Sequence, residues 1–188
     1  MRPTPNDPDA WYAYLAEGNR TQARKRVAAD ALIRNRAGHV LLVKPTYKPG
    51  WDLPGGMAEA NEAPEAALIR ELREELGLNA ALRQLLVVDW VPPHGPWDDQ
   101  IAFIFDAGTL DDTQATALRP HDNELAEIAF VPIDKAPALL RSRICNRLHA
   151  AVQACETGCP MYLHDGHRSG HPHPNRAVPR PGPAGTPG

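Results

Sequence analysis

Residues 56–78 read GMAEANEAPEAALIRELREELGL, and this stretch decides how the rest of the chain is interpreted. Its second half, Pro64–Leu76, has the composition and spacing of a helix, with proline in the first turn, where no backbone amide partner is needed. At 100° per residue, Glu71, Glu74 and Glu75 fall within about 100° of one another. The sequence therefore predicts a helix with three carboxylates gathered on one side.

A second side of the same helix is apolar. Ile69, Leu72 and Leu76 share a sector of the helical wheel and are predicted to pack on a core. Ala67 lies among the carboxylates and adds no bulk there, while Gly77 suits the C-terminal end of the helix. We therefore expect open space in front of the acidic side.

The acidic side favours a divalent cation. Like charges one helical turn apart destabilise a helix by a few tenths of a kcal/mol per pair, roughly 0.2–0.5. Arg70 lies four residues before Glu74 and offsets part of this repulsion, but a bound cation would offset far more. Clustered carboxylate oxygens suit Mg²⁺ or Mn²⁺, and Mg²⁺ takes its remaining ligands from water and substrate phosphates. The chemistry inferred is hydrolysis of a phosphoanhydride, although Glu-rich helices are also typical of a plain solvated face.

The glycines before the helix support the same interpretation. Without Cβ atoms, the Gly55–Gly56 backbone can approach a metal or phosphate closely and offer a carbonyl oxygen. Glu62 lies at the end of the same loop and can reach back toward the acidic cluster.

The complete string resembles the Nudix box. The family pattern is Gly, five residues, Glu, seven residues, then Arg-Glu-apolar-any-Glu-Glu-any-Gly-apolar. This sequence matches at every defined position, which are Gly56, Glu62, Arg70, Glu71, Leu72, Glu74, Glu75, Gly77 and Leu78. So many matches at fixed spacing make a chance occurrence negligible.

The resemblance implies a fold and a reaction. The fold would be α/β (α+β), a Nudix-type α/β/α sandwich with a mixed sheet. The reaction would be Mg²⁺-dependent hydrolysis of a nucleoside diphosphate linked to another moiety, with Mn²⁺ as a substitute. Glu71, Glu74, Glu75 and the Gly55 carbonyl would be the metal ligands.

The resemblance also implies the other roles at the site. Arg70 would orient a glutamate and Glu62 would brace the loop. The catalytic set would thus be Arg70, Glu71, Glu74 and Glu75, with either Glu71 or Glu75 as the base for the attacking water. Some members take a base from a later loop, for which Glu124 and Glu127 are candidates; the alternative is that both are ordinary surface acids.

The substrate is less well defined by sequence. Trp51 can stack on a nucleobase and Lys44 can touch phosphate, beside the Gly55–Gly56 backbone, although each side chain is also typical of core or surface. Pro92–Pro93 weakly favours ADP-ribose or a similar nucleotide sugar over a nucleoside triphosphate. A catalytically silent nucleotide sensor stays open as the alternative function.

Strand and helix patterns surround the box. Alternating or continuous apolar runs bounded by turn residues predict strands, and a stripe of apolar residues every three or four positions predicts helices. The predicted strands are 27–33, 39–43, 82–91, 100–105, 125–132 and 161–163, the predicted helices besides 64–76 are 9–17 and 136–155, and a loop is expected over 111–121.

Composition sets the outer limits. A chain of 188 residues with 43% hydrophobic and 23% charged residues has room for one globular domain. We expect an N-terminal extension over 1–26, a Nudix domain over 27–164 and a disordered Pro/Gly-rich tail over 165–188. A net charge of -3 without a basic stripe argues against a nucleic-acid partner.

The sequence also suggests where the protein is found and how it assembles. No apolar run approaches the roughly 18 residues of a membrane span, and the first residues lack the apolar segment typical of a secretory signal, so a cytoplasmic protein without membrane contact is expected. A homodimer is possible by family resemblance. The spacing of Cys155, Cys159, His164 and His167 suits Zn²⁺. We favour the alternative that these residues simply belong to the end of a helix, a short strand and a turn.

Overall fold

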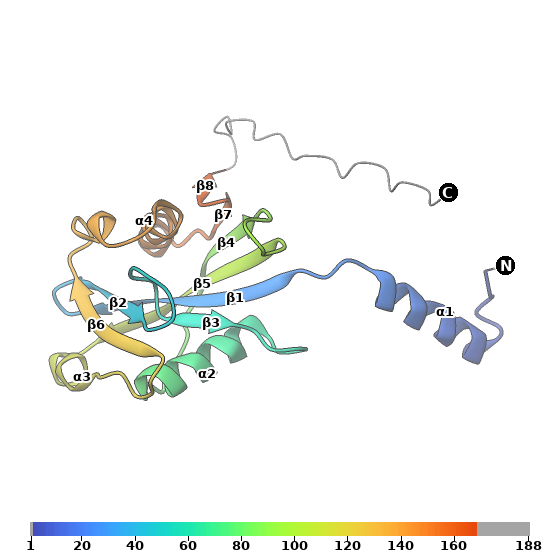
Figure 1. The fold of residues 1–188 in the computed structure, drawn as a ribbon, viewed down its shortest axis with the longest axis horizontal. Coiled ribbons are helices and arrows are strands. Elements are labelled where there is room, and N and C mark those ends of the chain that lie inside the picture. Colours follow the sequence, from blue (N-terminus) through green and yellow to red (C-terminus); the bar gives the residue numbers. More distant parts are fainter. Residues whose placement is uncertain (1, 169–188) are drawn as a thin grey trace, which may run out of the picture.

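The computed structural model describes residues 2–168 (Figure 1), so most of the predicted tail over 165–188 lies outside the described residues. The elements in chain order are α1 (Pro8–Thr21), β1 (Arg26–Asn35), β2 (Val40–Pro45), β3 (Gly55–Met57), α2 (Pro64–Leu76), β4 (Leu85–Val91), β5 (Gln100–Leu110), α3 (Asp112–Ala117), β6 (Leu125–Val131), the 3₁₀ turn η1 (Ala136–Ala138), α4 (Ser142–Thr157), β7 (Met161–His164) and β8 (His167–Arg168).

The strands form one mixed sheet. Its order among the described residues is β6-β2-β1-β5-β4-β7-β8, with β3 paired to β1 beside this path. The pairs β1–β5 and β4–β7 are parallel, and the other pairs are antiparallel. The short β3 sets Gly55 opposite Asp30 in register, which brings the start of the box against the middle of β1.

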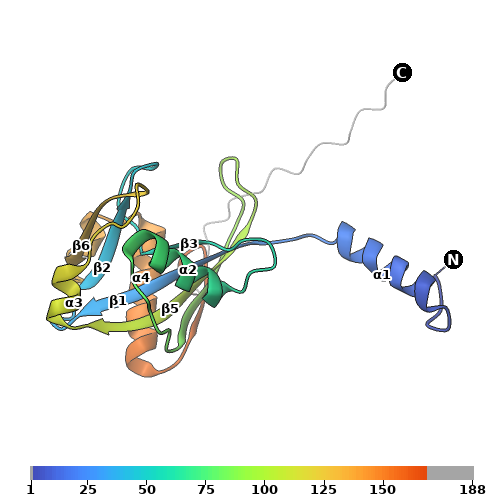
Figure 2. The same cartoon turned by 90° about the horizontal axis from the view of Figure 1, so that it is seen from below.

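Helices cover both faces of the sheet (Figures 1 and 2). On β1, Leu32 belongs to the core under α4, while its neighbours Ala31 and Ile33 belong to the core under α2. This alternation follows from the two-residue period of a strand, because each face of a doubly covered strand needs apolar side chains. The predicted α/β/α sandwich with a mixed sheet is confirmed.

The box helix α2 has the predicted bounds, but its apolar face is turned by one residue from the prediction. Leu68, Leu72 and Leu76 are the leucines that pack under the sheet, whereas Ile69 is 41% exposed. Positions four apart lie almost in line along a helix, and Ile69 lies 100° further round, toward solvent. Gly77 ends the helix in the left-handed conformation, as expected.

The predicted helix over 136–155 was wrong in its first part. The chain forms η1, then passes through Leu139–Arg141 in a non-helical path before α4 begins at Ser142. Leu140 makes an isolated parallel bridge to Trp51 and is buried, so this stretch packs beside the segment between β2 and β3 rather than on a helical stripe.

The remaining differences have local causes. The helix predicted over 9–17 begins earlier, because Asp7 rather than Asp9 caps it, and it continues past Gly18 to Thr21. The expected loop over 111–121 contains α3, which starts with a reciprocal capping box between Asp111 and Gln114.

Helix α1 projects away from the sheet and its covering helices (Figures 1 and 2), and none of its residues is buried. Nowhere between residues 2 and 168 does a helix combine the length and the apolar character that crossing a membrane requires.

Candidate active site

A cavity of about 630 Å³ opens between the start of the box and helix α4. Its lining comes from β1, β3 and α2 on one side and from the first turns of α4 on the other. The volume lies within the range of pockets for small molecules, roughly 300–1,000 Å³. The cavity is therefore large enough for a nucleotide-sized ligand.

Two glycines bring the backbone close to the acidic helix. A Cβ on Gly55 would lie 2.2 Å from the carbonyl oxygen of Ala29, and its φ of 136° is one that other residues rarely adopt. A Cβ on Gly56 would lie 2.6 Å from the carboxyl carbon of Glu71. Real Cβ atoms do not approach other atoms this closely, so only glycine at these positions lets β3 and the Glu71 carboxylate lie as they do.

Glu75 is the most unusual carboxylate of the cavity. It is only 4% exposed, and its Oε2 atom is buried without a hydrogen-bond partner. Burial raises the pKa of Glu75 to about 8, with further increases from Glu71, Asp122 and Glu124, while the backbone of Gly55 opposes the rise. A buried carboxylate oxygen without a partner is costly, which makes this atom a natural ligand for a cation.

Glu71 lies beside Glu75 on the cavity wall and is half-buried. Burial raises its pKa, and the nearby charges of Glu74 and Glu124 add to this, while the hydrogen bond and charge of Arg70 oppose the rise. The two cavity-facing carboxylates thus repel each other in a poorly solvated place.

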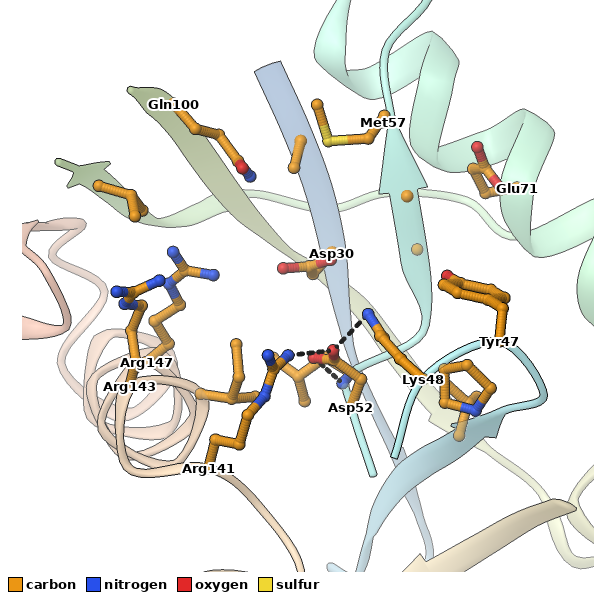
Figure 3. A pocket seen from close by; sticks show the side chains of 18 of the residues that line it. Asp30, Tyr47, Lys48, Asp52, Met57, Glu71, Gln100, Arg141, Arg143 and Arg147 are labelled. Atoms are coloured by element: carbon orange, nitrogen blue, oxygen red, sulfur yellow. Dashed lines mark hydrogen bonds and ion pairs between the residues drawn. The ribbon is translucent and has the colours of Figure 1, made fainter. Parts of the chain in front are cut away.

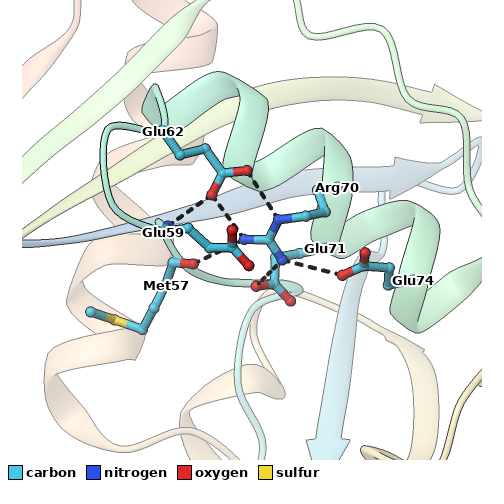
Figure 4. Close-up of polar contacts among 6 residues, drawn as sticks. All are labelled: Met57, Glu59, Glu62, Arg70, Glu71 and Glu74. Atoms are coloured by element: carbon cyan, nitrogen blue, oxygen red, sulfur yellow. Dashed lines mark hydrogen bonds and ion pairs between the residues drawn. The ribbon is translucent and has the colours of Figure 1, made fainter.

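Arg70 joins the acidic helix to the preceding loop (Figure 4). Its Nε and Nη2 atoms donate to the two carboxylate oxygens of Glu62, each at 3.0 Å, and Nη2 also donates to the Met57 carbonyl. Its Nη1 atom donates to Glu71 at 2.9 Å and to Glu74 at 3.2 Å. This paired geometry fixes the carboxylate of Glu71 relative to the loop.

The three predicted ligands are not equivalent. Glu71 and Glu75 line the cavity together with Gly55 and Gly56, whereas Glu74 lies outside the lining and contacts Arg70. Between residues 2 and 168, no three His, Cys, Asp or Glu side chains converge on a ready-made metal centre, and this includes the cysteines and histidines near the C-terminus.

A divalent cation fits this arrangement nonetheless. Mg²⁺ is usually bound by one or two carboxylates plus waters and substrate phosphates, rather than by a complete protein cage. The unpartnered Glu75 oxygen, the neighbouring Glu71 carboxylate and the glycine backbone supply hard oxygen donors of that kind.

Of the other candidate residues Glu124, Glu127, Lys44 and Trp51, only Glu124 lines the cavity. Glu127 pairs with Lys44 on the β6–β2 ladder, with 3.5 Å between its Oε2 and the lysine Nζ. Lys44 lies over the ring of Trp51, with its Nζ 5.9 Å from the ring centroid, and neither side chain lines the cavity.

Sequence reasoning missed the opposite half of the cavity (Figure 3). Its charged residues are Lys48, Asp52, Arg141, Arg143 and Arg147, and Asp30 on β1 lies between them and the glutamates. The one available signal was Asp30, a charged residue in the middle of the apolar run VAADALI, where a buried carboxylate demands an explanation. Burial, followed by the charge of Asp52, raises the pKa of Asp30 to about 7.

A family model described as NUDIX domain matches residues 24–148, which is well over half of the chain. The chain belongs to the Nudix family. It is 46% identical over 54 residues to a putative 8-oxo-dGTP diphosphatase of Bacillus subtilis, a match that covers 29% of this chain and 36% of that protein.

Two further proteins, one compared by sequence and one by structure, are similar to this chain. The chain is 35% identical over 82 residues to an ADP-ribose pyrophosphatase of Methanocaldococcus jannaschii, covering 42% of this chain and 48% of that protein. A crystal structure of a UDP-X diphosphatase has the same fold, with a TM-score of 0.65 at 24% identity, over 81% of this Nudix chain and 73% of that one. The matches span less than half the length of these two curated relatives.

Proposed function

We propose that this Nudix protein is a Mg²⁺-dependent pyrophosphohydrolase, which cleaves the phosphoanhydride bond of a nucleoside diphosphate linked to another moiety. The observation that carries the proposal is the pair Glu71 and Glu75, which face one nucleotide-sized cavity beside Gly55 and Gly56. The unpartnered Oε2 atom of Glu75 supports it further, because the fold keeps this atom dry at a stability cost.

The chain would hold the metal at one wall of the cavity. Glu71, Glu75 and the Gly55 carbonyl would be its protein ligands, and Glu74 would act from outside the cavity through Arg70. When bound, Mg²⁺ supplies charge neutralisation at phosphate oxygens and acidifies water.

The side chains of the cavity would do the remaining chemistry. Glu75 or Glu71 would accept the proton of the attacking water, and Glu124 lines the same cavity as a further candidate. Arg70 touches both Glu62 and Glu71, so it would act as a positioning residue that keeps the carboxylate of Glu71 at the wall.

The relatives indicate the general class of substrate but not the particular compound. Those relatives are named for the hydrolysis of 8-oxo-dGTP and of ADP-ribose, which share a nucleoside diphosphate unit. A nucleotide sugar such as ADP-ribose or a nucleoside triphosphate therefore fits the proposal.

A substrate panel tests the proposal. Nucleoside triphosphates, nucleotide sugars, dinucleoside polyphosphates and NADH would be incubated with Mg²⁺ and the products identified by mass. We expect a nucleoside monophosphate or pyrophosphate from at least one class. Saturable binding of a nucleotide without any cleavage across the panel would instead favour the sensor function.

We expect Gly56→Ala to lower kcat/KM by about tenfold to a hundredfold, because the new methyl group must displace the Glu71 carboxylate, and misplacement of a reacting group by about 1 Å costs on that order. The melting temperature should change little, since a flexible side chain yields first. Gly18→Ala is the matched control, as its Cβ would meet nothing within 4 Å. Unchanged kinetics in Gly56→Ala would contradict the assigned position of Glu71.

A further inference from the structure

The wall of the cavity opposite the acidic helix is basic. Arg141, Arg143 and Arg147 reach it from the start of α4, and Lys48 reaches it from the loop after β2 (Figure 3). Glu71 lies on the other side of the same view, and Asp30 lies between the two walls. One cavity thus has an acidic end and an arginine-rich end.

The arginines are only partly neutralised by carboxylates. Lys48 and Arg141 share the single carboxylate of Asp52, at 2.8 and 3.1 Å, so two cations meet one anion. Asp52 also accepts the backbone N–H of Leu53, which commits it to the protein. One net positive charge therefore remains among Lys48, Arg141 and Asp52, and all three side chains line the cavity.

The other two arginines each form an ion pair with a carboxylate that lies outside the cavity lining. Arg143 pairs with Asp165 through Nε, and Arg147 pairs with Asp89 through Nε at 2.6 Å. Neither Asp89 nor Asp165 lines the cavity, whereas both arginines do. Because the guanidinium is a planar fork with several N–H groups, a partner at Nε leaves other donors for a second anion.

Arg147 is the strongest indication that the arginines of this wall are held in fixed positions. It is only 4% exposed, yet it lies at the cavity rather than reaching bulk water. Each of the three arginines has a carboxylate partner, but Lys48 shares Asp52 with Arg141, so this wall keeps an excess of positive charge that an anion in the cavity would neutralise.

We propose that the Arg141, Arg143 and Arg147 wall is a second anion subsite, which binds a phosphate or carboxylate carried by the part of the substrate away from the diphosphate that is cleaved. The inference rests on the proposed function and refines it, since it selects substrates with an additional anionic group over their neutral counterparts. Charge-assisted, bidentate contacts of arginine are the ordinary means of such selection.

Asp30 limits where the anion lies. Its carboxyl stands between the two walls and repels an anion when ionised. The second anion is therefore expected at the arginine side, apart from the cleaved diphosphate at the glutamate side.

Two matched pairs of compounds test the subsite and separate the sources of the charge. CoA and dephospho-CoA differ by one phosphate, and UDP-glucuronate and UDP-glucose differ by one carboxylate. Binding would be measured by calorimetry with Mg²⁺ on the full chain carrying Glu75→Gln, and hydrolysis would be measured on the protein without that substitution. In at least one pair, we expect about tenfold tighter binding of the more charged member, from one or two charge-assisted contacts.

Arg141→Gln and Arg143→Gln should each remove most of that preference, while binding of the less charged member stays within about twofold. Each substitution also removes an ion pair, but Asp52 keeps Lys48 and the Asp165 side chain is 35% exposed, so neither carboxylate is left fully buried without a partner. Arg36→Gln is the matched control: the Arg36 side chain is 67% exposed, close to the 62% of Arg141, and lies at the β1–β2 turn outside the cavity lining. Arg147 is not substituted in this test, because its removal would also leave Asp89 unpaired.

The outcomes distinguish a failure of the proposed anion subsite from a failure of the proposed hydrolytic activity. Hydrolysis of the panel without preference within either pair, or a preference that survives both arginine substitutions, would overturn the subsite alone. A charge preference that depends on Arg141 and Arg143, in a protein that cleaves no compound, would support the subsite and reject the proposed hydrolysis.

Discussion

Glu75→Gln is expected to lower kcat by about 10²–10⁴-fold, the range for loss of a positioned acid–base group, and at the same time to make the metal-free protein more stable at alkaline pH. The first effect follows from the proposed roles of Glu75 in holding the cation and accepting a proton. The second follows from its burial, because a neutral amide does not carry the cost of a buried charge.

The sign of the stability effect follows from the shifted pKa. The pKa of Glu75 is raised from 4.5 to about 8 in the folded protein, so the unfolded chain ionises this group more readily. Ionisation then favours unfolding, and the contribution to stability falls as pH rises from about 4.5 to about 8 and is constant above that. The glutamine variant lacks this decrease, so its advantage is largest above pH 8 and vanishes near pH 4.

Melting curves between pH 5 and 9 in the presence of EDTA measure the second effect, and Mg²⁺-dependent turnover measures the first. We expect the variant to melt several degrees above the unsubstituted protein at pH 9, where about 1 kcal/mol corresponds to roughly 2–4 °C in a domain of this size. Glu65→Gln, on the exposed first turn of the same helix, is the control. Normal turnover in Glu75→Gln, or equal melting curves at every pH, would contradict this account.

Arg147→Met is expected to destabilise the fold by about 3–5 kcal/mol, the usual cost of breaking a buried ion pair by removing one partner. Asp89, on β4, has no exposed surface, and it accepts from Arg147 at 2.6 Å and from the backbone N–H of Gly166 at 3.0 Å. The pair therefore ties α4, β4 and the β7–β8 turn together. Without the guanidinium, a buried carboxylate keeps only one donor.

Urea unfolding at neutral pH measures this loss. The double variant Arg147→Met with Asp89→Asn should recover more than half of the stability, because it removes the stranded charge and keeps an acceptor for Gly166. A single variant within about 1 kcal/mol of the unsubstituted protein would show that the pair is not the brace described here.

The box helix could be predicted because its evidence is local. Proline at the first turn, the spacing of the glutamates and Gly77 specify α2 within one segment, and the structure has those bounds. The apolar face was misjudged by one position, at Ile69, since the wheel does not tell which of two neighbouring apolar residues faces the sheet. The family resemblance implied that Arg70 orients a glutamate and that Glu62 braces the loop, but the contact between Arg70 and Glu62 was not predicted.

The opposite wall of the cavity could not be predicted, because it depends on long-range packing. Arg141 and Arg143 precede and begin a helix that lies far along the chain from the box, and only the sheet brings that end of α4 over Asp30 and Asp52. The sequence likewise could not tell that Trp51 and Lys44 lie outside the lining of this cavity, since Trp51 bridges to Leu140, just before α4, and Lys44 pairs with Glu127 on β6. A local pattern gives residue chemistry, whereas the neighbours across the sheet decide which residues face the cavity.

The binding of Mn²⁺, followed by electron paramagnetic resonance as the loss of signal from the free ion, tests the central claim most directly, because it needs no substrate. The account predicts a saturable site in the unsubstituted protein, at least about tenfold weaker binding in Glu71→Gln and in Glu75→Gln, since each removes a charged ligand, and unchanged binding in Glu65→Gln. Equal Mn²⁺ binding in all four proteins, or none in any of them, would contradict the claim that Glu71 and Glu75 hold a divalent cation.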